Sequence, residues 1–374
     1  MRIAFDGCLL RPQGNTGVEK CILRLAQALS LREDLEIFLY VRRDVKLPEW
    51  GDALTVRRVV PNKLGRPGRI AWQQLGLSRW AKRDGAELIH APGYVAPLSC
   101  KVPYVLTVYD MMALLAPRFC RPLNRWHYRT VMPRSIRGAA LVLVPTEWVK
   151  SLLVSTLEIK ENRVLVIPPG IDGSFQLLPR EETEPLRERL FLEDTTLLFV
   201  GNLEINKNPL LILRVLSSLK KKAHKKAKCI FVGRKGRAFK EMGKYVKENK
   251  LYGNVILPGY VSDEDIVQYF NVADVFVFPS LHEGFGMPPL EAMACGCPVV
   301  CSEGPPFDEV VGNAALKADP HLPEKWVDSV ERLQQEEEGR KQLIQAGLDR
   351  MKQFTWDSAA QRTVEAYGRA IEVC

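Results

Sequence analysis

The chain lacks any long hydrophobic segment. No stretch of its 374 residues approaches the roughly 18 consecutive apolar residues that a membrane-spanning helix needs. Residues 1–7 read as a strand followed by a turn, without the apolar core of a signal peptide. We therefore expect a cytoplasmic protein. Hydrophobic residues still make up 46% of the chain, and its length is typical of two domains of ordinary size.

Disulfide frameworks and metal-ligand spacings are missing as well. The nine cysteines are odd in number and scattered, unlike the cysteines of a small secreted protein. Cys295, Cys297 and Cys301 form the only cluster. They lack a fourth ligand and a metal-binding spacing, so we interpret them as small buried side chains. The acids at 263–265 have D-x-D spacing but follow Ser262 and read as a helix start. We expect no metal site and no cofactor.

Acidic residues are fewer than basic ones, which gives a net charge of +9. Nucleic acid, an anionic membrane surface or a phosphorylated substrate could each account for it. Two basic clusters contain tryptophans and suggest reversible attachment to the cytoplasmic membrane face. Alternatively, Trp72 and Trp80 are core residues and the arginines line an acceptor cleft. The first cluster comprises Lys63, Arg66, Arg69, Arg79, Lys82 and Arg83, and the second Arg118, Arg121, Arg125, Arg129, Arg134 and Arg137, with Trp126.

Short apolar strands alternate with helical stretches, a pattern typical of an α/β fold with a mostly parallel sheet. The clearest helix, Val18–Ser30, carries Cys21, Ile22, Leu25 and Leu29 on one face. The predicted strands are Ile3–Asp6, Ile37–Tyr40, Thr55–Val60, Leu88–His90, Tyr104–Tyr109, Leu141–Val144 and Val164–Ile167, then Leu197–Val200, Cys229–Val232, Val255–Leu257, Val275–Phe278 and Pro298–Cys301.

A turn-rich segment, Pro168–Gly173, divides the pattern, and the residues after it are polar through Asp194. We therefore predict an N-terminal domain over residues 1–172, a linker over 173–194 and a C-terminal domain over 195–355. Each half resembles a Rossmann-like unit, in which ligands bind beyond the carboxyl ends of the strands.

The most informative stretch is residues 279–300. The apolar strand before it runs into a loop that holds Glu283, and a glycine-permitted turn, 284–286, follows. Two prolines at 288–289 predict a helix start, because their missing N–H groups would be unpaired there. Glu291 is then expected in the first helical turn. Amides at the helix start suit phosphate or sugar oxygens, and the two carboxylates suit hydroxyls, so the combination favours a sugar nucleotide.

This stretch resembles the E-x7-E motif of retaining family-4 glycosyltransferases, whose wider pattern is close to P-S-x-x-E-G-F-G-x-P-x-L-E-A-M-A-x-G-x-P-V-V. The resemblance covers nearly the whole chain and implies the GT-B architecture, two Rossmann-like domains facing each other across a cleft. Residues 356–374 resemble the family's closing helix, which returns to the N-terminal domain. By resemblance, Glu291 accepts hydrogen bonds from the ribose, and Glu283 lies by the transferred sugar with the amides of Gly284, Phe285 and Gly286.

Two further loops carry the resemblance. The segment 14–20 resembles the family's N-terminal glycine loop, where Gly14 and Gly17 permit close approach of the backbone to a ligand. The segment 201–208 resembles G-x-L-x-x-x-K-[NG], and the matching Lys207 is expected to contact the donor diphosphate. Many relatives have arginine at the position of Asn202 or Asn206. This chain does not, so we expect Lys207 to act with Arg234 or Lys235.

Val105–Asp110 resembles the family's T-V-H-D segment with one departure. Tyr109 replaces a histidine that lies near the donor sugar in relatives, and a phenol stays neutral near pH 7. Asp110 is either an acceptor-side group or a structural turn residue. His90 ends another strand, and a structural role and an acceptor-cleft role are both open.

The resemblance implies a retaining, metal-independent glycosyltransferase that moves a hexose from a nucleoside diphosphate to a glycan or lipid-linked acceptor. Mannose from GDP-mannose is our first candidate, because many similar proteins build bacterial surface polysaccharides from it; glucose, galactose, N-acetylglucosamine and rhamnose are open as well. Alternatives are a non-catalytic nucleotide-sugar binder, an epimerase or phosphorylase of the same architecture, and a nucleic-acid-binding protein. The last is suggested only by net charge, and we expect no nucleic acid partner. The predicted catalytic residues are Glu283, Lys207, Asp110 and Tyr109, and the predicted donor-binding residues are Gly14, Gly17, Asn202, Lys207, Arg234, Lys235, Glu283, Gly284, Phe285, Gly286 and Glu291.

Overall fold

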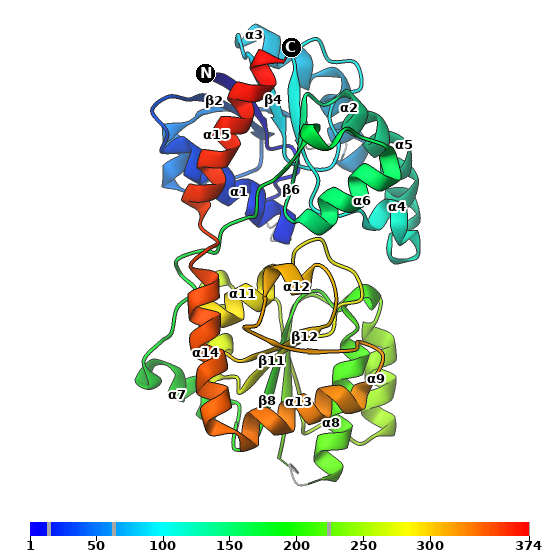
Figure 1. The fold of residues 1–374 in the computed structure, drawn as a ribbon, viewed down its shortest axis with the longest axis vertical. Coiled ribbons are helices and arrows are strands. Elements are labelled where there is room, and N and C mark those ends of the chain that lie inside the picture. The colour runs from blue at the N-terminus through cyan, green and yellow to red at the C-terminus, as the bar shows by residue number, and fades with distance from the viewer. Residues whose placement is uncertain (13–15, 62–64, 223–225, 374) are drawn as a thin grey trace. The chain divides into compact units, whose positions relative to one another are not determined.

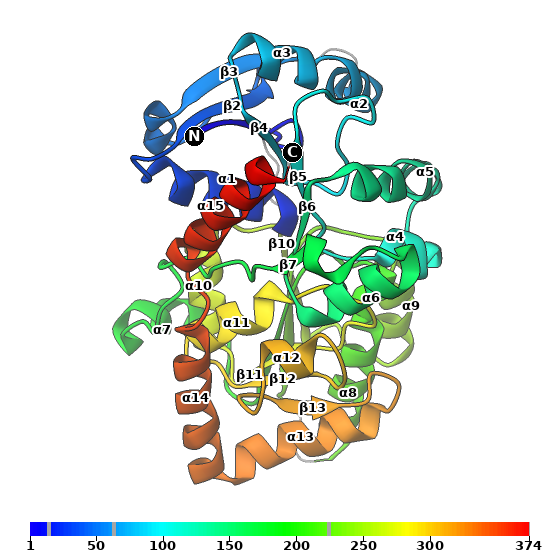
Figure 2. The same ribbon diagram turned by 45° about the horizontal axis from the view of Figure 1, so that its top comes forward.

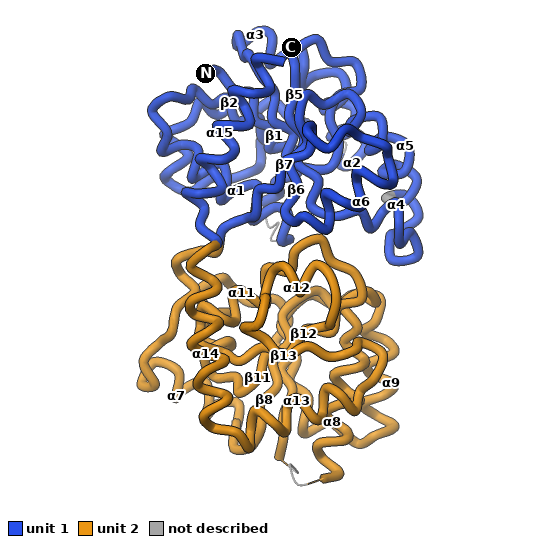
Figure 3. The backbone as a smooth tube through the Cα atoms, in the orientation of Figure 1, with its two compact units in different colours: residues 1–170, 354–374 blue, residues 171–353 orange. Residues whose placement is uncertain are grey.

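A computed structural model describes residues 1–12, 16–61, 65–222 and 226–373 (Figure 1). The chain forms two compact units, one of residues 1–170 with 354–374 and the other of residues 171–353 (Figure 3). The C-terminal helix therefore belongs to the first unit, together with the strands of the N-terminal half. No helix within the described ranges is long and apolar enough to cross a membrane.

The first unit is built on a parallel sheet of seven strands within its described residues, in the order β3-β2-β1-β4-β5-β6-β7. Helices cover both faces of such a sheet, so its central strands are mostly apolar; Ile3, Ala4 and Phe5 of β1 have no exposed surface. The strand order reverses between β1 and β4, the point where ligands bind in open parallel sheets. The strands are β1 Arg2–Asp6, β2 Glu36–Arg42, β3 Thr55–Val60, β4 Leu88–Ala91, β5 Tyr104–Thr107, β6 Leu141–Val144 and β7 Val164–Val166.

The helices of the first unit begin and end where the sequence supplies caps. Thr16 accepts a hydrogen bond from the Glu19 amide and Glu19 reaches back to the Thr16 amide, a capping box that starts α1. The C-terminal helix α15 packs beside α1 (Figure 2). The helices are α1 Gly17–Ser30, α2 Gly65–Leu75, α3 Leu77–Arg83, α4 Met112–Leu115, α5 Pro122–Gly138, α6 Glu147–Leu157 and α15 Trp356–Glu372, with 3-10 turns η1 Glu49–Ala53, η2 Pro117–Phe119 and η3 Glu161–Arg163.

The second unit repeats the plan with a sheet of six parallel strands in the part that the structure describes, in the order β10-β9-β8-β11-β12-β13. The strands are β8 Thr196–Val200, β9 Lys228–Val232, β10 Val255–Gly259, β11 Val275–Phe278, β12 Val299–Ser302 and β13 Leu316–Ala318. The helices are α7 Arg180–Arg189, α8 Pro209–Lys221, α9 Phe239–Glu248, α10 Asp263–Val272, α11 Met287–Ala294, α12 Phe307–Val310, α13 Pro323–Gln335 and α14 Glu337–Met351, with the 3-10 turn η4 Ile205–Lys207.

The structure differs from the sequence prediction in the linker, in one strand that was not predicted and in several strand ends. Residues 173–194, expected to form a linker, belong to the second unit and contain α7, which packs on α10. Only Thr183 and Leu186 of α7 are buried, so its sequence is almost entirely polar. Strand β13 was not predicted, and β5 ends at Thr107 rather than Tyr109.

Candidate functional site

A lysine–carboxylate pair lies at the carboxyl ends of two adjacent strands of the second unit. Strands β8 and β11 are paired in the sheet; Lys207 ends the 3-10 turn after β8, and Glu283 lies in the loop after β11. The Lys207 ammonium forms a short ion pair with Glu283 Oε1. The side chains are only 23% and 15% exposed, so water screens this pair less than it screens a surface pair.

Three contacts hold the pair in place. The amide of Leu281 donates to the Asn206 carbonyl at 2.7 Å, which joins the two loops through the backbone. The buried Ser280 hydroxyl donates to Glu283 Oε1 at 2.6 Å. The Lys207 ammonium lies 5.0 Å from the centre of the Phe278 ring. Ser280 and Phe278 were not predicted as site residues, although Ser280 precedes Glu283 by three residues in the motif itself.

The residue after the lysine explains part of the sequence pattern. Asn208 has a φ of +53°, a conformation that asparagine and glycine tolerate best, and it starts α8. Its side-chain amide donates to the Pro320 carbonyl at 2.8 Å. Asparagine or glycine therefore suits this position because the chain must turn sharply there.

The neighbouring loop, after β9, packs directly on the loop after β8. A Cβ on Gly233 would lie 2.1 Å from the Gly201 carbonyl oxygen, so only glycine fits. The amide of Leu203 donates to the Arg234 carbonyl at 3.0 Å. Asn202, Arg234 and Lys235 are thus brought to one edge of the sheet, as predicted for residues at strand ends.

Two of the three cations of this loop lie over aromatic rings, and the third, Arg237, forms an ion pair with Glu204 at 2.7 Å. The Arg234 guanidinium lies 5.0 Å from the centre of the Tyr260 ring. The Lys235 ammonium lies 4.7 Å from the centre of the Phe239 ring. A planar guanidinium can form two parallel hydrogen bonds to a phosphate.

Helix α11 follows the Glu283 loop, and its start differs slightly from the prediction. The helix begins at Met287, one residue before the two prolines. Glu291 therefore lies in the second turn rather than the first, and the first-turn assignment was wrong. Gly286 has a φ of +98°, and a Cβ there would lie 2.8 Å from the Phe307 ring. Pro288 and Pro289 have no N–H, so the amides of Gly286 and Met287 are the ones at this end without a carbonyl partner inside the helix, and they can bind oxygen atoms.

Glu291 is 8% exposed, and Gly284, Phe285 and Gly286 are buried. A carboxylate in this position can bind only a ligand group that reaches into the site. Together, an ammonium, a guanidinium, two carboxylates and a helix N-terminus lie on the carboxyl side of one sheet. This set can bind a diphosphate through cations and amides, and hydroxyl groups through carboxylates.

In the first unit, the predicted glycine loop is only partly described. Gly14 lies outside the described residues. Gly17 is the first residue of α1, exposed and without a positive φ, and a Cβ there would meet nothing within 4 Å. The structure therefore shows open space at Gly17 rather than a steric need for glycine.

Asp110 is held by its own unit. Its Oδ2 accepts a hydrogen bond from the Tyr94 hydroxyl at 2.6 Å, and its Oδ1 accepts one from the Met112 amide at 2.8 Å. The second contact starts α4. These contacts support the structural reading of Asp110, and its catalytic assignment stays a prediction.

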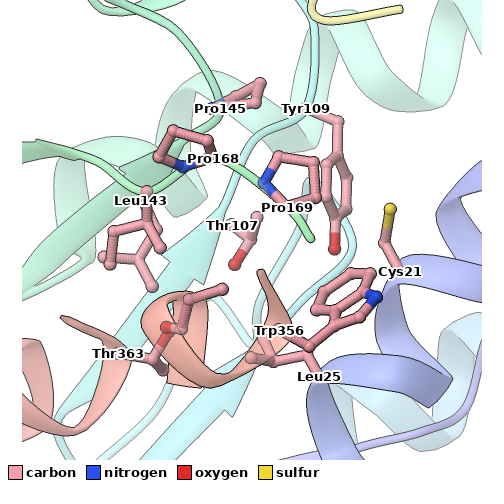
Figure 4. A pocket seen from close by; sticks show the side chains of 12 residues that line it. Cys21, Leu25, Thr107, Tyr109, Leu143, Pro145, Pro168, Pro169, Trp356 and Thr363 are labelled. Carbon is pink, nitrogen blue, oxygen red and sulfur yellow. The ribbon is translucent and has the colours of Figure 1, made fainter. Parts of the chain in front are cut away.

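Tyr109 lies against a small pocket of the first unit, lined by residues of α1, β5, β6 and α15 (Figure 4). Its ring makes an edge contact with Tyr94, with 5.9 Å between centroids. Figure 4 shows Tyr109, Thr107, Cys21 and Trp356 converging on the pocket. Burial raises the pKa of Tyr109 well above its usual value, so the phenol remains protonated. It can donate a hydrogen bond but cannot act as a cation.

Asp6 is a candidate ligand-site residue that was not predicted from the sequence. It ends β1 at the point where the strand order reverses, and it is 2% exposed. Gln73 Nε2 donates to Asp6 Oδ2 at 2.7 Å, and the Cys8 amide donates to Oδ1 at 3.0 Å. Burial raises the pKa of Asp6. The sequence feature that could have identified Asp6 is an acidic residue at the end of an apolar strand.

His90 has a structural role. Its ring is fully buried, with Nδ1 2.7 Å from the Tyr367 hydroxyl and Nε2 2.8 Å from Thr107 Oγ1. Both ring nitrogens are thus occupied by α15 and β5, which leaves none for an acceptor. Burial lowers the pKa of His90 from 6.5 to about 3.

This pKa predicts acid sensitivity. Above pH 6.5 His90 is neutral in both the folded and the unfolded chain, but below it unfolding takes up a proton. The contribution of neutral His90 to the free energy of unfolding is therefore present above pH 6.5 and is lost as the pH falls toward 3. Between pH 7 and 5 the loss is about 2 kcal/mol. Urea unfolding of wild type and His90→Gln should show that the variant, less stable at pH 7, loses about 2 kcal/mol less over this range. Equal losses in the two proteins would contradict this prediction, because both retain His127 and they differ only at position 90.

Metal-binding groups are not found in the part of the chain that the structure describes: no three His, Cys, Asp or Glu side chains cluster suitably. Metal independence of the reaction stays a prediction. The acids at 263–265 begin α10, with Ser262 capping the Asp265 amide at 3.0 Å, as predicted. Cys295, Cys297 and Cys301 are buried and unpaired by disulfides.

Comparison with known proteins identifies similar chains. The family model for glycosyl transferases group 1 matches residues 181–350, and that for glycosyltransferase family 4 matches residues 15–175. O-antigen chain mannosyltransferase B of Escherichia coli is 29% identical over 293 residues, 77% of this chain and 76% of that protein. D-inositol 3-phosphate glycosyltransferase of Corynebacterium diphtheriae is 28% identical over 386 residues, 95% of this chain and 90% of that protein.

Among solved structures, Anabaena HepE in complex with UDP and glucose matches with a TM-score of 0.78 at 18% identity, over 98% of this chain and 99% of that chain. A likeness at this identity shows the fold. It confirms the prediction of two Rossmann-like α/β domains.

Proposed function

Because the chain belongs to the group 1, family 4 glycosyltransferases, as its motifs indicated, we propose that it transfers a hexose with retention of configuration from a nucleoside diphosphate to a hydroxyl of a glycan or lipid-linked acceptor. Mannose from GDP-mannose is the donor we favour, in surface polysaccharide synthesis, because a similar protein is an O-antigen chain mannosyltransferase. The complex of HepE with UDP and glucose supports a nucleotide-sugar donor.

The observation that carries the proposal is the Lys207–Glu283 pair beside the start of α11. The bond from the anomeric carbon to the diphosphate oxygen breaks, and negative charge grows on the leaving diphosphate. An ammonium placed against that oxygen stabilises the charge more in the transition state than in the bound donor. We assign this role to Lys207.

The acceptor hydroxyl forms the new bond to the anomeric carbon and loses its proton. In the proposed front-face reaction, the leaving phosphate oxygen takes that proton. No protein nucleophile is then needed, and the configuration at the anomeric carbon is retained. Glu283 orients the transferred sugar through its hydroxyls and keeps the Ser280 hydrogen bond as Lys207 turns to the diphosphate.

Nucleotide binding is assigned to the same edge of the sheet. Glu291 accepts hydrogen bonds from the ribose hydroxyls, and Arg234 or Lys235 contributes a second cation for the diphosphate. These assignments follow from the family motif and from the placement of the residues at adjacent strand ends.

A panel of nucleotides and nucleotide sugars tests the proposal. GDP and GDP-mannose are expected to raise the unfolding temperature most, because a ligand at 100 times its Kd stabilises the folded state by about 2.7 kcal/mol. GDP-mannose should also be hydrolysed slowly without acceptor, and proton NMR of a transfer product should show the α-anomer of the donor preserved. A larger increase in the unfolding temperature with a uridine or thymidine nucleotide would show that the donor carries that nucleotide in place of GDP. No shift and no hydrolysis with any of them would refute the assignment.

A further inference from the structure

One surface of the first unit combines exposed apolar side chains with arginines. We name it the α5 face and define it by the apolar residues Leu115, Leu123 and Trp126 with Arg118, Arg121, Arg125 and Arg129. Leu123 is 77% exposed and Trp126 is 70% exposed, unusual values for large apolar residues. The face extends from α4 along the first turns of α5, which pack side by side (Figure 1).

The segment that forms the α5 face has charge of one sign. The sequence has no aspartate or glutamate between Asp110 and Glu147, whereas six arginines lie in that segment: Arg118, Arg121, Arg125, Arg129, Arg134 and Arg137. All six are exposed. An anionic surface would meet these cations without meeting a carboxylate of the same segment.

The opposite side of α5 is fixed in the core. Met132 and Ile136 have almost no exposed surface and belong to the apolar cluster beneath the sheet. The helix therefore cannot rotate to bury Trp126 without exposing these residues. The exposure of Trp126 is therefore not a result of poor packing of α5 against the core.

The other basic cluster does not share these features. Trp72 is buried in the core, and Trp80 packs against the core with the Arg83 guanidinium 4.9 Å from its ring centre. Trp72 is thus a core residue, as the alternative held, whereas Trp80 is half-buried. Neither tryptophan of that cluster is exposed as Trp126 is.

We propose that the α5 face docks the protein on an anionic phospholipid bilayer, with Trp126 and Leu123 at the headgroup level and the arginines on lipid phosphates. Tryptophan prefers the membrane interface, and an apolar edge with several cations gives reversible binding. Each nearby arginine strengthens attraction to anionic lipid about fivefold. The inference uses no residue of the Lys207–Glu283 site and is independent of the proposed function.

Vesicle co-sedimentation tests the docking. Wild type should pellet with phosphatidylcholine vesicles that contain about 30 mol% phosphatidylglycerol, and less so as salt rises. Arg125→Gln with Arg129→Gln should weaken binding about 25-fold. Trp126→Ala should weaken it about tenfold, and Trp126→Phe much less.

Matched controls lie elsewhere on the same unit. Leu31 is 77% exposed, like Leu123, so Leu31→Ser and Leu123→Ser remove equal apolar surface at two places. Arg79→Gln with Arg83→Gln removes the same charge from α3. Both controls should stay within about twofold of wild type. The nucleotide-induced thermal shift should be unchanged in every variant, which separates this test from that of the proposed function.

Several outcomes would overturn the docking. Equal pelleting with pure phosphatidylcholine, or none with anionic vesicles, excludes it. Controls that lose as much binding as the α5 variants show that the net charge, and not this face, attracts the lipid. Full competition by random-sequence duplex DNA at the same salt would assign the arginines to nucleic acid instead.

Discussion

Lys207→Ala is expected to lower kcat for sugar transfer by a factor on the order of 10² to 10³, the effect of removing one group that stabilises charge in a transition state. The lysine is the cation that the structure places at the end of β8 beside Glu283. Without the lysine, the negative charge of the leaving diphosphate develops near the Glu283 carboxylate with no ammonium from Lys207 to offset it. Steady-state rates of nucleoside diphosphate release with saturating donor measure the loss.

Lys222→Ala is the matched control. Lys222 also forms an ion pair in the second unit, with Glu331 at 2.7 Å, but it is 51% exposed. Its removal should change kcat less than twofold, because surface ion pairs contribute little. A loss in Lys222→Ala as large as that in Lys207→Ala would mean that the lysine effect is one of folding.

A chelator provides the second half of the test. If Lys207 and the helix amides alone offset the diphosphate charge, EDTA leaves the wild-type rate unchanged. A strict requirement for added Mn²⁺ or Mg²⁺ would contradict metal independence. It would also reduce the part of the diphosphate charge stabilisation that is assigned to Lys207.

Coupling between the two residues can be measured as well. Lys207→Ala leaves the Glu283 charge in a largely shielded site, where it repels the diphosphate. The Lys207→Ala, Glu283→Ala double variant should therefore lose less activity than the product of the two single losses. Strictly multiplicative losses would show that the pair seen in the structure has no part in the reaction.

The strands with long apolar runs could be predicted from sequence, because parallel strands covered on both faces are apolar at every position. Strand β13 could not. It has three residues with Lys317 at its centre, and only its pairing with β12 makes it a strand. Helix α7 was missed for a similar reason. Its polar sequence indicated a linker, but α7 packs on α10, with Thr183 and Leu186 buried and the Arg187 guanidinium donating to the Val272 carbonyl at 3.0 Å.

The candidate site shows the same limit. The motifs identified Lys207 and Glu283 separately, from residues 76 positions apart in the chain. Their contact depends on β8 and β11 being neighbours, which the order of strands along the sequence does not specify. The contact between Asp6 and Gln73 likewise joins a strand end to a helix that no local pattern connects.

The two glutamates of the motif are assigned different roles, which kinetics can separate. Glu291→Ala is expected to raise the donor KM by about 10- to 150-fold with little change in kcat, the effect of losing hydrogen bonds to a charged group worth about 1.5–3 kcal/mol. Glu291 is 8% exposed, and its carboxylate is assigned to the ribose, which does not change in the reaction. Initial rates over a range of donor concentrations give both constants.

Glu283→Ala should show the opposite pattern, with kcat lower by a similar factor and the donor KM unchanged or smaller. Glu283 is assigned to the transferred sugar, whose contacts matter most as the anomeric bond breaks. Its removal also releases Lys207 from its ion pair, so the ammonium binds the donor diphosphate without competition. Glu264→Ala, an exposed acid on α10 of the same unit, should match wild type in both constants. If Glu283→Ala and Glu291→Ala both keep wild-type kinetics, the site is elsewhere; if their patterns are exchanged, Glu291 lies by the sugar and Glu283 by the ribose.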